Sequence, residues 1–173
     1  MGAAVKVVFE YHQIDVVIFD FDGVLTDNRV IIDQSGQESV VCNRADGLAF
    51  DVLRAVGLPT YIVSTETVPL AQVRGRKLQV PVLHGVKNKL EALHKLTTEN
   101  DFSLKKTLYA GNDLNDYYAM KECGIRVCPA DSHAEIKAIS DVVLEARGGE
   151  GVAREIIEVV LGINIAETLY KNE

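Results

Sequence analysis

The sequence predicts a three-layer α/β fold in which helices cover both faces of a mainly parallel sheet. Short β-branched apolar runs alternate with longer segments whose apolar residues repeat at helical spacing. The first run, residues 16–19, is apolar at every position, as expected for a central strand with both faces buried. Acidic residues follow this run directly. In such folds, ligands bind at the carboxyl ends of the strands, so we expect a site there.

The first half of the chain supplies two strands, a hairpin and a helix. After the strand at 16–19, residues 29–33 and 38–42 alternate in polarity around the polar turn Gln34-Ser35-Gly36-Gln37, which predicts a β-hairpin flap. Residues 45–56 carry an apolar stripe at helical spacing, and Gly57 marks the end of that helix. A strand at 60–63 follows.

Strands and helices alternate through the second half. We expect helices at residues 70–78, 88–96, 116–122, 133–139 and 152–161, and strands at residues 80–83, 107–110, 125–127 and 142–144. In the second of these helices Leu90, Leu93 and Leu96 share one face. This order favours right-handed crossovers and a parallel sheet.

Composition indicates one acidic domain spanning residues 1–173. The chain has 18 Lys plus Arg against 25 Asp plus Glu, a net charge of −7, and 47% hydrophobic residues. This balance argues against nucleic-acid binding and favours small-molecule chemistry. The three cysteines lack a metal-binding spacing and are too few for a disulfide framework. Residues 1–13 contain no sustained apolar run, and no segment is long enough to span a membrane, so we expect a cytoplasmic protein.

The polar residues at the predicted strand ends form a candidate site. They are Asp20 and Asp22, Ser64 and Thr65, and Asn112, Asp113 and Asp116, with Lys89 opening a helix nearby. Each residue alone could equally be a helix cap, a turn residue or a surface charge. Their joint position predicts that they converge.

The segment Asp20-Phe21-Asp22-Gly23-Val24-Leu25-Thr26-Asp27 resembles the first motif of the haloacid dehalogenase-like (HAD) hydrolase superfamily. The resemblance continues through Ser64, Lys89 and the loop at 111–116, and it implies a Rossmann-like fold. It also implies that Asp20 attacks phosphorus to form an aspartyl-phosphate and that Asp22 is the general acid and base. Ser64 and Lys89 would bind the phosphoryl group, and Mg²⁺ would be held by Asp20, Asp22 and either Asn112 or Asp113.

Residues 43–47, 88–90 and 147–155 are similar to the capless branch of this superfamily. That branch includes 3-deoxy-D-manno-octulosonate 8-phosphate phosphatases and the C-terminal domain of acylneuraminate cytidylyltransferases. The interval between Asp22 and Ser64 is too short for a cap domain. The resemblance implies a homotetramer whose hairpin meets a neighbouring subunit. It also implies a phosphatase of lipopolysaccharide or sialic acid biosynthesis, with an octulosonate 8-phosphate or nonulosonate 9-phosphate as substrate. Thr65, Arg44 and Arg74 are candidate substrate ligands.

Two positions depart from the phosphatase pattern and keep a second hypothesis open. Asn112 stands where the pattern usually has Asp, and Thr65-Glu66 stand where octulosonate phosphatases tend to have Gly-Arg. Asn supplies a metal-binding oxygen without a charge, and Glu66 would repel a phosphate. The alternative is therefore a catalytically weak or inactive oligomerisation or regulatory module, related to the cytidylyltransferase tail.

Overall fold

The computed structural model describes residues 9–171, and its centre is a six-stranded sheet with the strand order β5-β4-β1-β6-β7-β8. Every neighbouring pair in this sheet is parallel. The strands are β1 (Val16–Asp20), β4 (Thr60–Val63), β5 (Val82–Leu83), β6 (Thr107–Ala110), β7 (Ile125–Cys128) and β8 (Val142–Val143). The predicted α/β class is confirmed. The prediction that residues 1–13 contain no sustained apolar run falls partly on residues 1–8, which lie outside the described residues.

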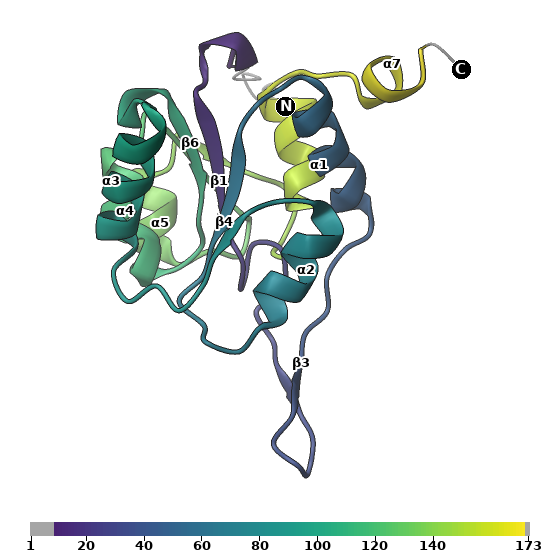
Figure 1. The fold of residues 1–173 in the computed structure, drawn as a ribbon, viewed down its shortest axis with the longest axis vertical. Coiled ribbons are helices and arrows are strands. Elements are labelled where there is room, and N and C mark those ends of the chain that lie inside the picture. The colour runs from purple at the N-terminus through teal and green to yellow at the C-terminus, as the bar shows by residue number, and fades with distance from the viewer. Residues whose placement is uncertain (1–8, 172–173) are drawn as a thin grey trace, which may run out of the picture.

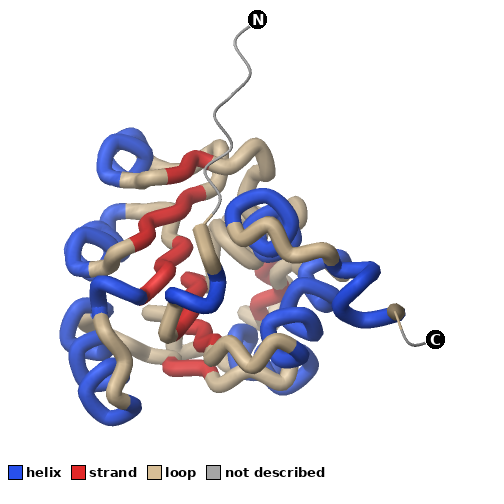
Figure 2. Tube along the Cα trace, turned by 90° about the horizontal axis from the view of Figure 1, so that it is seen from above, coloured by secondary structure: helices blue, strands red, loops and turns tan. Residues whose placement is uncertain are grey.

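Helices cover both faces of the sheet (Figures 1 and 2). One layer contains α1 (Ala45–Ala55), α2 (Leu70–Leu78) and α6 (Val152–Glu155); the other contains α3 (Lys89–Asn100), α4 (Tyr117–Glu122) and α5 (Ala134–Ile139). Strand β1 serves both layers because its side chains alternate. Val17 and Phe19 belong to the apolar core on one face. Val16 and Ile18 belong to the core on the other.

Short helical segments complete the chain. The expected helix at 152–161 is α6 followed directly by a π-helical stretch, Ile156–Val160, so the helix changes its hydrogen-bond pattern after one turn. Helix α7 (Ile165–Tyr170) was not predicted and lies at the end of the molecule opposite the hairpin (Figure 1). Three 3₁₀ turns occupy Tyr11–Gln13, Leu104–Lys106 and Leu114–Asp116. Within residues 9–171, no helix has the length and apolarity needed to cross a membrane.

The predicted hairpin is present but its paired part is shorter. Strands β2 (Ile31–Ile32) and β3 (Glu38–Ser39) are antiparallel and project from the carboxyl edge of the main sheet (Figure 1). The Asp33 carboxylate holds the turn by accepting from the backbone N–H groups of Ser35 and Gln37, and the Asp33 N–H donates to the Gln37 carbonyl at 3.1 Å. The ladder is shorter mainly at its base, where residues 29–30 and 40–41 are not in strands. Ile31 and Ile32 are each 62% exposed, so packing against the rest of this chain does not stabilise a longer pair of hairpin strands.

The register of β1 sets the position of the site. Asp20 pairs with Val63 on β4, and Phe19 pairs with Ala110 on β6. The residues that follow these two strands, Ser64 and Gly111, therefore leave the sheet beside Asp20. Helix α3 begins nearby, where the side chain of Asn88 caps its N-terminus. The predicted candidates consequently meet at one edge.

Candidate active site

Asp20, the last residue of β1, lies in a buried cluster of three charged side chains. Lys89 Nζ is 2.7 Å from Asp20 Oδ1 and 2.7 Å from Asp116 Oδ1. The side chains of Lys89, Asp20 and Asp116 are only 1%, 6% and 0% exposed. The backbone N–H of Phe21 also donates to Asp20 Oδ1, at 2.7 Å. We call these three side chains the charged cluster. When both acids are ionised, it carries one excess negative charge.

Burial shapes the acidities in the charged cluster. Desolvation, reinforced by Asp116, raises the pKa of Asp20 to about 8 against the attraction of Lys89. Burial alone would lower the pKa of Lys89, but its two carboxylate partners outweigh that effect and raise the pKa. Lys89 is therefore fully protonated near neutral pH. A bound divalent cation would favour the Asp20 carboxylate and oppose the effect of burial.

Asp116 connects the charged cluster to the loop after β6. Its Oδ1 also accepts a hydrogen bond from the Tyr109 hydroxyl at 3.0 Å, and its Oδ2 accepts one from the backbone N–H of Asn112 at 3.0 Å. The sequence places Asp116 at this edge without assigning it a role, and it does not identify Tyr109. A buried tyrosine hydroxyl at a strand end needs a partner, and this is the available signal.

The side chain of Asn112 faces oxygen atoms of the first motif. Its Oδ1 lies 3.1 Å from Asp20 Oδ2 and 3.0 Å from the main-chain oxygen of Asp22. Three acceptors so placed repel one another unless a cation lies among them, or unless the amide turns over and its nitrogen donates to both. Neighbouring ligands of an octahedral Mg²⁺, at about 2.0–2.1 Å from the ion, lie about 3 Å apart. The donor set therefore fits a small, hard divalent cation.

A metal at this position would depend on more than carboxylates. Within residues 9–171, no three His, Cys, Asp or Glu side chains gather as a metal site. Asp113, the other sequence candidate, is exposed, and its Oδ1 accepts from the backbone N–H of Leu114 at 2.8 Å. Asn112, not Asp113, is the residue that faces Asp20 and Asp22.

Two adjoining cavities open beside these groups. The first, which we call the polar cleft, has a volume of about 380 Å³ and is lined in part by Asp20, Asp22, Thr65, Glu66 and Asn112. The second, the hairpin cleft, has a volume of about 230 Å³ and runs beneath the hairpin. Asp22, Asn28 and Glu66 line both cavities. Asp22 therefore stands between the charged cluster and the space under the hairpin.

The hairpin cleft is acidic around Asp22. Glu38 and Glu66 line this cleft, and the basic side chain that lines it is Arg29. Desolvation, together with Glu66 and Glu38, raises the pKa of Asp22, although Lys89 opposes this. A raised pKa keeps a proton on Asp22 at higher pH, which suits a general acid.

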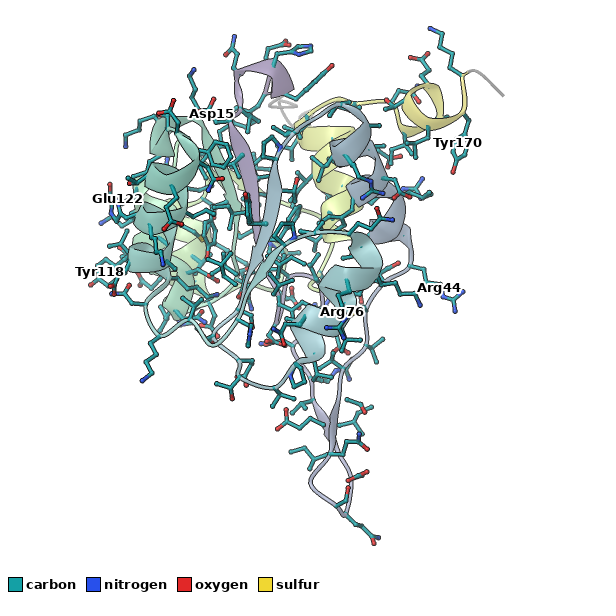
Figure 3. All side chains as sticks on the ribbon, in the orientation of Figure 1. Asp15, Arg44, Arg76, Tyr118, Glu122 and Tyr170 are labelled. Carbon is teal, nitrogen blue, oxygen red and sulfur yellow. The ribbon has the colours of Figure 1, made fainter. Side chains whose placement is uncertain are left out.

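The remaining predicted site residues lie in different surroundings. Ser64 is fully buried, and its hydroxyl accepts from the backbone N–H of Glu66 at 3.2 Å, whereas Thr65 lines the polar cleft. Arg74 donates to the main-chain oxygen of Asn43 at 2.8 Å. Arg44 extends outward from the start of α1 (Figure 3). Neither arginine lines the two clefts, so their part in substrate binding stays a prediction.

Comparison with known proteins agrees with this geometry. The family model of haloacid dehalogenase-like hydrolases matches residues 70–156, half of the chain. The chain belongs to the haloacid dehalogenase-like hydrolases. The site residues that lie before residue 70, including Asp20 and Asp22, precede the matched segment.

Relatives of this HAD-like hydrolase extend over nearly its whole length. The 3-deoxy-D-manno-octulosonate 8-phosphate phosphatase KdsC of Yersinia pestis is 28% identical over 150 residues, which cover 86% of this chain and 80% of that protein. A structure described as a HAD family hydrolase from Streptomyces avermitilis is 38% identical, with a TM-score of 0.89 and coverage of 94% and 93%. The octulosonate phosphatase of Moraxella catarrhalis, solved with magnesium, phosphate and KDO, is 27% identical, with a TM-score of 0.82 and coverage of 91% and 90%. The expected phosphatase class of this HAD-like hydrolase is confirmed.

Proposed function

We propose that this HAD-like hydrolase is a Mg²⁺-dependent phosphatase of a 2-keto-3-deoxy sugar acid phosphate, of the octulosonate 8-phosphate or nonulosonate 9-phosphate type. One observation carries the proposal: Lys89 holds Asp20 Oδ1, while Asn112 Oδ1 faces both Asp20 Oδ2 and the carbonyl oxygen of Asp22. A carboxylate so placed can meet a phosphoryl group whose charge is shared by an ammonium and a metal ion. The octulosonate phosphatases among its relatives support the substrate class.

In the first half of the proposed reaction, a carboxylate oxygen of Asp20 attacks phosphorus and forms an aspartyl-phosphate. The bond between phosphorus and the sugar oxygen breaks, and Asp22 gives its proton to that oxygen. In the second half, Asp22 takes a proton from water. The resulting hydroxide attacks phosphorus, and phosphate leaves as the Asp20 carboxylate is restored. Burial and the two glutamates near Asp22 favour its protonated form at the start.

Lys89 and the metal would share the charge of the transferred group. Lys89 Nζ already lies 2.7 Å from the attacking carboxylate, so it needs little rearrangement to meet a phosphoryl oxygen. Asp20, Asn112 and the main-chain carbonyl of Asp22 would hold Mg²⁺, which supplies electrostatic stabilisation of phosphoryl oxygens when bound. Thr65 would contact the phosphoryl group from the polar cleft, and Ser64 would support that segment.

The leaving sugar acid would occupy the hairpin cleft. Its carboxylate requires a cation, and Arg29 lines this cleft whereas Glu38 and Glu66 repel an anion. We further propose that the chain acts as one cytoplasmic domain and assembles as a homotetramer. The exposed apolar side chains of the hairpin, Val30, Ile31, Ile32 and Val41, support assembly through this flap. A neighbouring subunit there could bring Arg44 or Arg74 toward the sugar acid.

Phosphate release tests this proposal directly. The wild-type protein is assayed with Mg²⁺ against octulosonate 8-phosphate, nonulosonate 9-phosphates and neutral sugar phosphates. We expect turnover that favours the sugar acids and is abolished by Asp20→Asn but retained by Asp51→Asn, a change on α1 away from the clefts. A preference for neutral sugars would contradict the substrate class. Absence of any Asp20-dependent turnover would favour the non-catalytic module.

A further inference from the structure

A late segment of the chain packs directly against the loop that carries the first motif. The backbone N–H of Gly149 donates to the carbonyl of Val24 at 3.0 Å. A Cβ added at Gly148 would collide with the carbonyl oxygen of Gly23 and would lie 2.9 Å from that of Thr26. A Cβ at Gly149 would lie 2.6 Å from the backbone nitrogen of Asp27. Only glycine permits this approach, so residues 148 and 149 fix one side of the loop.

The opposite side of Gly23 meets the candidate metal ligand. A Cβ on Gly23 would collide with the side-chain amide of Asn112, and the carbonyl of the preceding residue, Asp22, lies 3.0 Å from Asn112 Oδ1. The Gly23 N–H is held by Thr26 Oγ1 at 3.1 Å. Gly23 is thus confined between Gly148 and Asn112. A displacement at Gly148 would press on the carbonyl of Gly23 and so shift the Gly23 Cα. This Cα also belongs to the planar peptide unit that carries the Asp22 carbonyl, so that carbonyl would shift too.

Three carboxylates hold this late segment in place, one from within it and two from other parts of the chain. Glu155 accepts from the backbone N–H groups of residues 145 and 146, at 2.9 and 2.7 Å. Asp131 accepts from the N–H of Gly148 at 2.9 Å. Asp46 on α1, which is 1% exposed, accepts from the N–H of Arg154 at 3.2 Å. None of these carboxylates lines the polar cleft, so their arrangement serves the backbone of residues 145–155.

We infer that residues 145–155 form a brace that positions the metal-binding carbonyl of Asp22, an inference that rests on the proposed metal site. Gly148 is the positioning residue at the contact, and Asp131 and Asp46 anchor the brace. None of them touches the substrate or the metal. Their effect is to keep the Asp22 carbonyl, Asp20 and Asn112 at the separation that a small cation requires.

The test compares Gly148→Ala with Gly47→Ala. Gly47 lies in α1, and a Cβ there meets nothing within 4 Å. Mg²⁺ and Co²⁺ binding is measured by calorimetry on the full chain, and turnover is measured against metal concentration. We expect Gly148→Ala to weaken metal binding by about 10- to 100-fold, as found when supporting contacts of metal ligands are lost. Turnover should recover at high metal concentration. Gly47→Ala should bind as the wild type does.

A second variant keeps the inference testable if Gly148→Ala does not fold. Asp131→Ala leaves both glycines intact and removes one anchor, so we expect a smaller loss of metal affinity with the same rescue by excess metal. Unchanged metal affinity in a folded variant of either kind would overturn the brace. Failure of the wild type to bind metal would overturn both proposals. Weakened metal binding in the variants, together with no turnover by the wild type on any sugar phosphate, would overturn the proposed phosphatase function and leave the brace standing.

Discussion

The charged cluster and the rim of the hairpin cleft are neighbours that differ in exposure and in the pairing of their charges. In the cluster, Lys89 lies 2.7 Å from each of two carboxylates, and all three side chains are almost inaccessible. At the rim, Glu66 and Glu38 stand near Asp22 in an open cavity, and neither has a cationic partner among the ion pairs of residues 9–171. The chain thus preorganises the end where phosphorus would react. It leaves the other end to be completed by the substrate or by a second subunit.

Removing the cation of the charged cluster should have the largest effect. Lys89→Met leaves Asp20 and Asp116 buried together without their cation, so we expect a loss of roughly 3 to 5 kcal/mol in the free energy of unfolding. We also expect turnover to fall by about 10²- to 10³-fold. Urea unfolding and phosphate release measure the two effects. Lys87→Met, two residues earlier and exposed, is the control. Equal stability of the two variants would show that the cluster is not held by this pairing.

Asp46 is a buried carboxylate outside the charged cluster, and no lysine or arginine forms an ion pair with it among the described residues. It therefore tests what burial without such a pair does to stability. Burial raises the pKa of Asp46 from 3.8 to about 6, only partly offset by backbone hydrogen bonds and by Arg74. A raised pKa means that Asp46 favours folding below about pH 4, and this contribution is lost as the pH rises through 6. Relative to Asp46→Asn, the wild type should lose roughly 2 to 3 kcal/mol between pH 4 and 7. The free energy of unfolding of both proteins is measured from pH 4 to pH 7. A difference between them that stays constant over this range would rule out the effect.

Asn112 lies where the cluster meets the polar cleft, and its substitution should act in opposite directions with and without metal. Asn112→Asp adds a negative charge beside Asp20 Oδ2 and the Asp22 carbonyl. We expect lower thermal stability without metal and about 10-fold tighter Mg²⁺ binding, because the added carboxylate strengthens a hard-cation site. Calorimetry and thermal unfolding, each with and without Mg²⁺, check this. Unchanged affinity would point to Asp113 as the ligand.

Changes at the open rim should have the smallest effect. Glu66→Gln removes one negative charge from the hairpin cleft while keeping the shape of the side chain. We expect KM for a sugar acid phosphate to fall only a few-fold, since exposed charges interact weakly through water. Glu99→Gln, an exposed change at the far end of α3, serves as the control. A large loss of kcat in Glu66→Gln would assign this residue to the chemistry instead of the rim.

Much of the fold could be predicted because the central strand is apolar on both faces. The register of β1 then follows from its neighbours, and it brings Asp20 beside Ser64 and Asn112. The hairpin strands and α7 were harder to predict. Ile31 and Ile32 are exposed, so burial does not set the length of the hairpin strands, and α7 has only one buried residue, Ile165. The alternating pattern predicts the hairpin but not how much of it is paired, and no clear periodic pattern marks α7.

Within the site, the pattern of residue types predicted the residues of the charged cluster. It did not predict which neighbouring side chains enter the clefts or which contacts hold them. Whether Ser64 or Thr65 enters the cleft depends on one step of register, which moves a side chain to the other face. Arg74 is held by a main-chain oxygen of a loop, a contact without a sequence signature. Tyr109 and Asp116 are seven residues apart, and the turn after β6 brings them together so that the Tyr109 hydroxyl donates to Asp116 Oδ1.

The central position of β1 also governs when the surroundings of Asp20 can form during synthesis. Asp20 is synthesised before the segments that surround it: its strand pairs with β4 and β6, and its cation and the brace come from later parts of the chain. Parallel pairing between distant segments is slow because the loops between them must close first. A nascent chain therefore carries the complete first motif long before it can enclose Asp20. The Asp20 carboxylate is enclosed only after β4, Lys89, β6 and residues 145–155 have all been made.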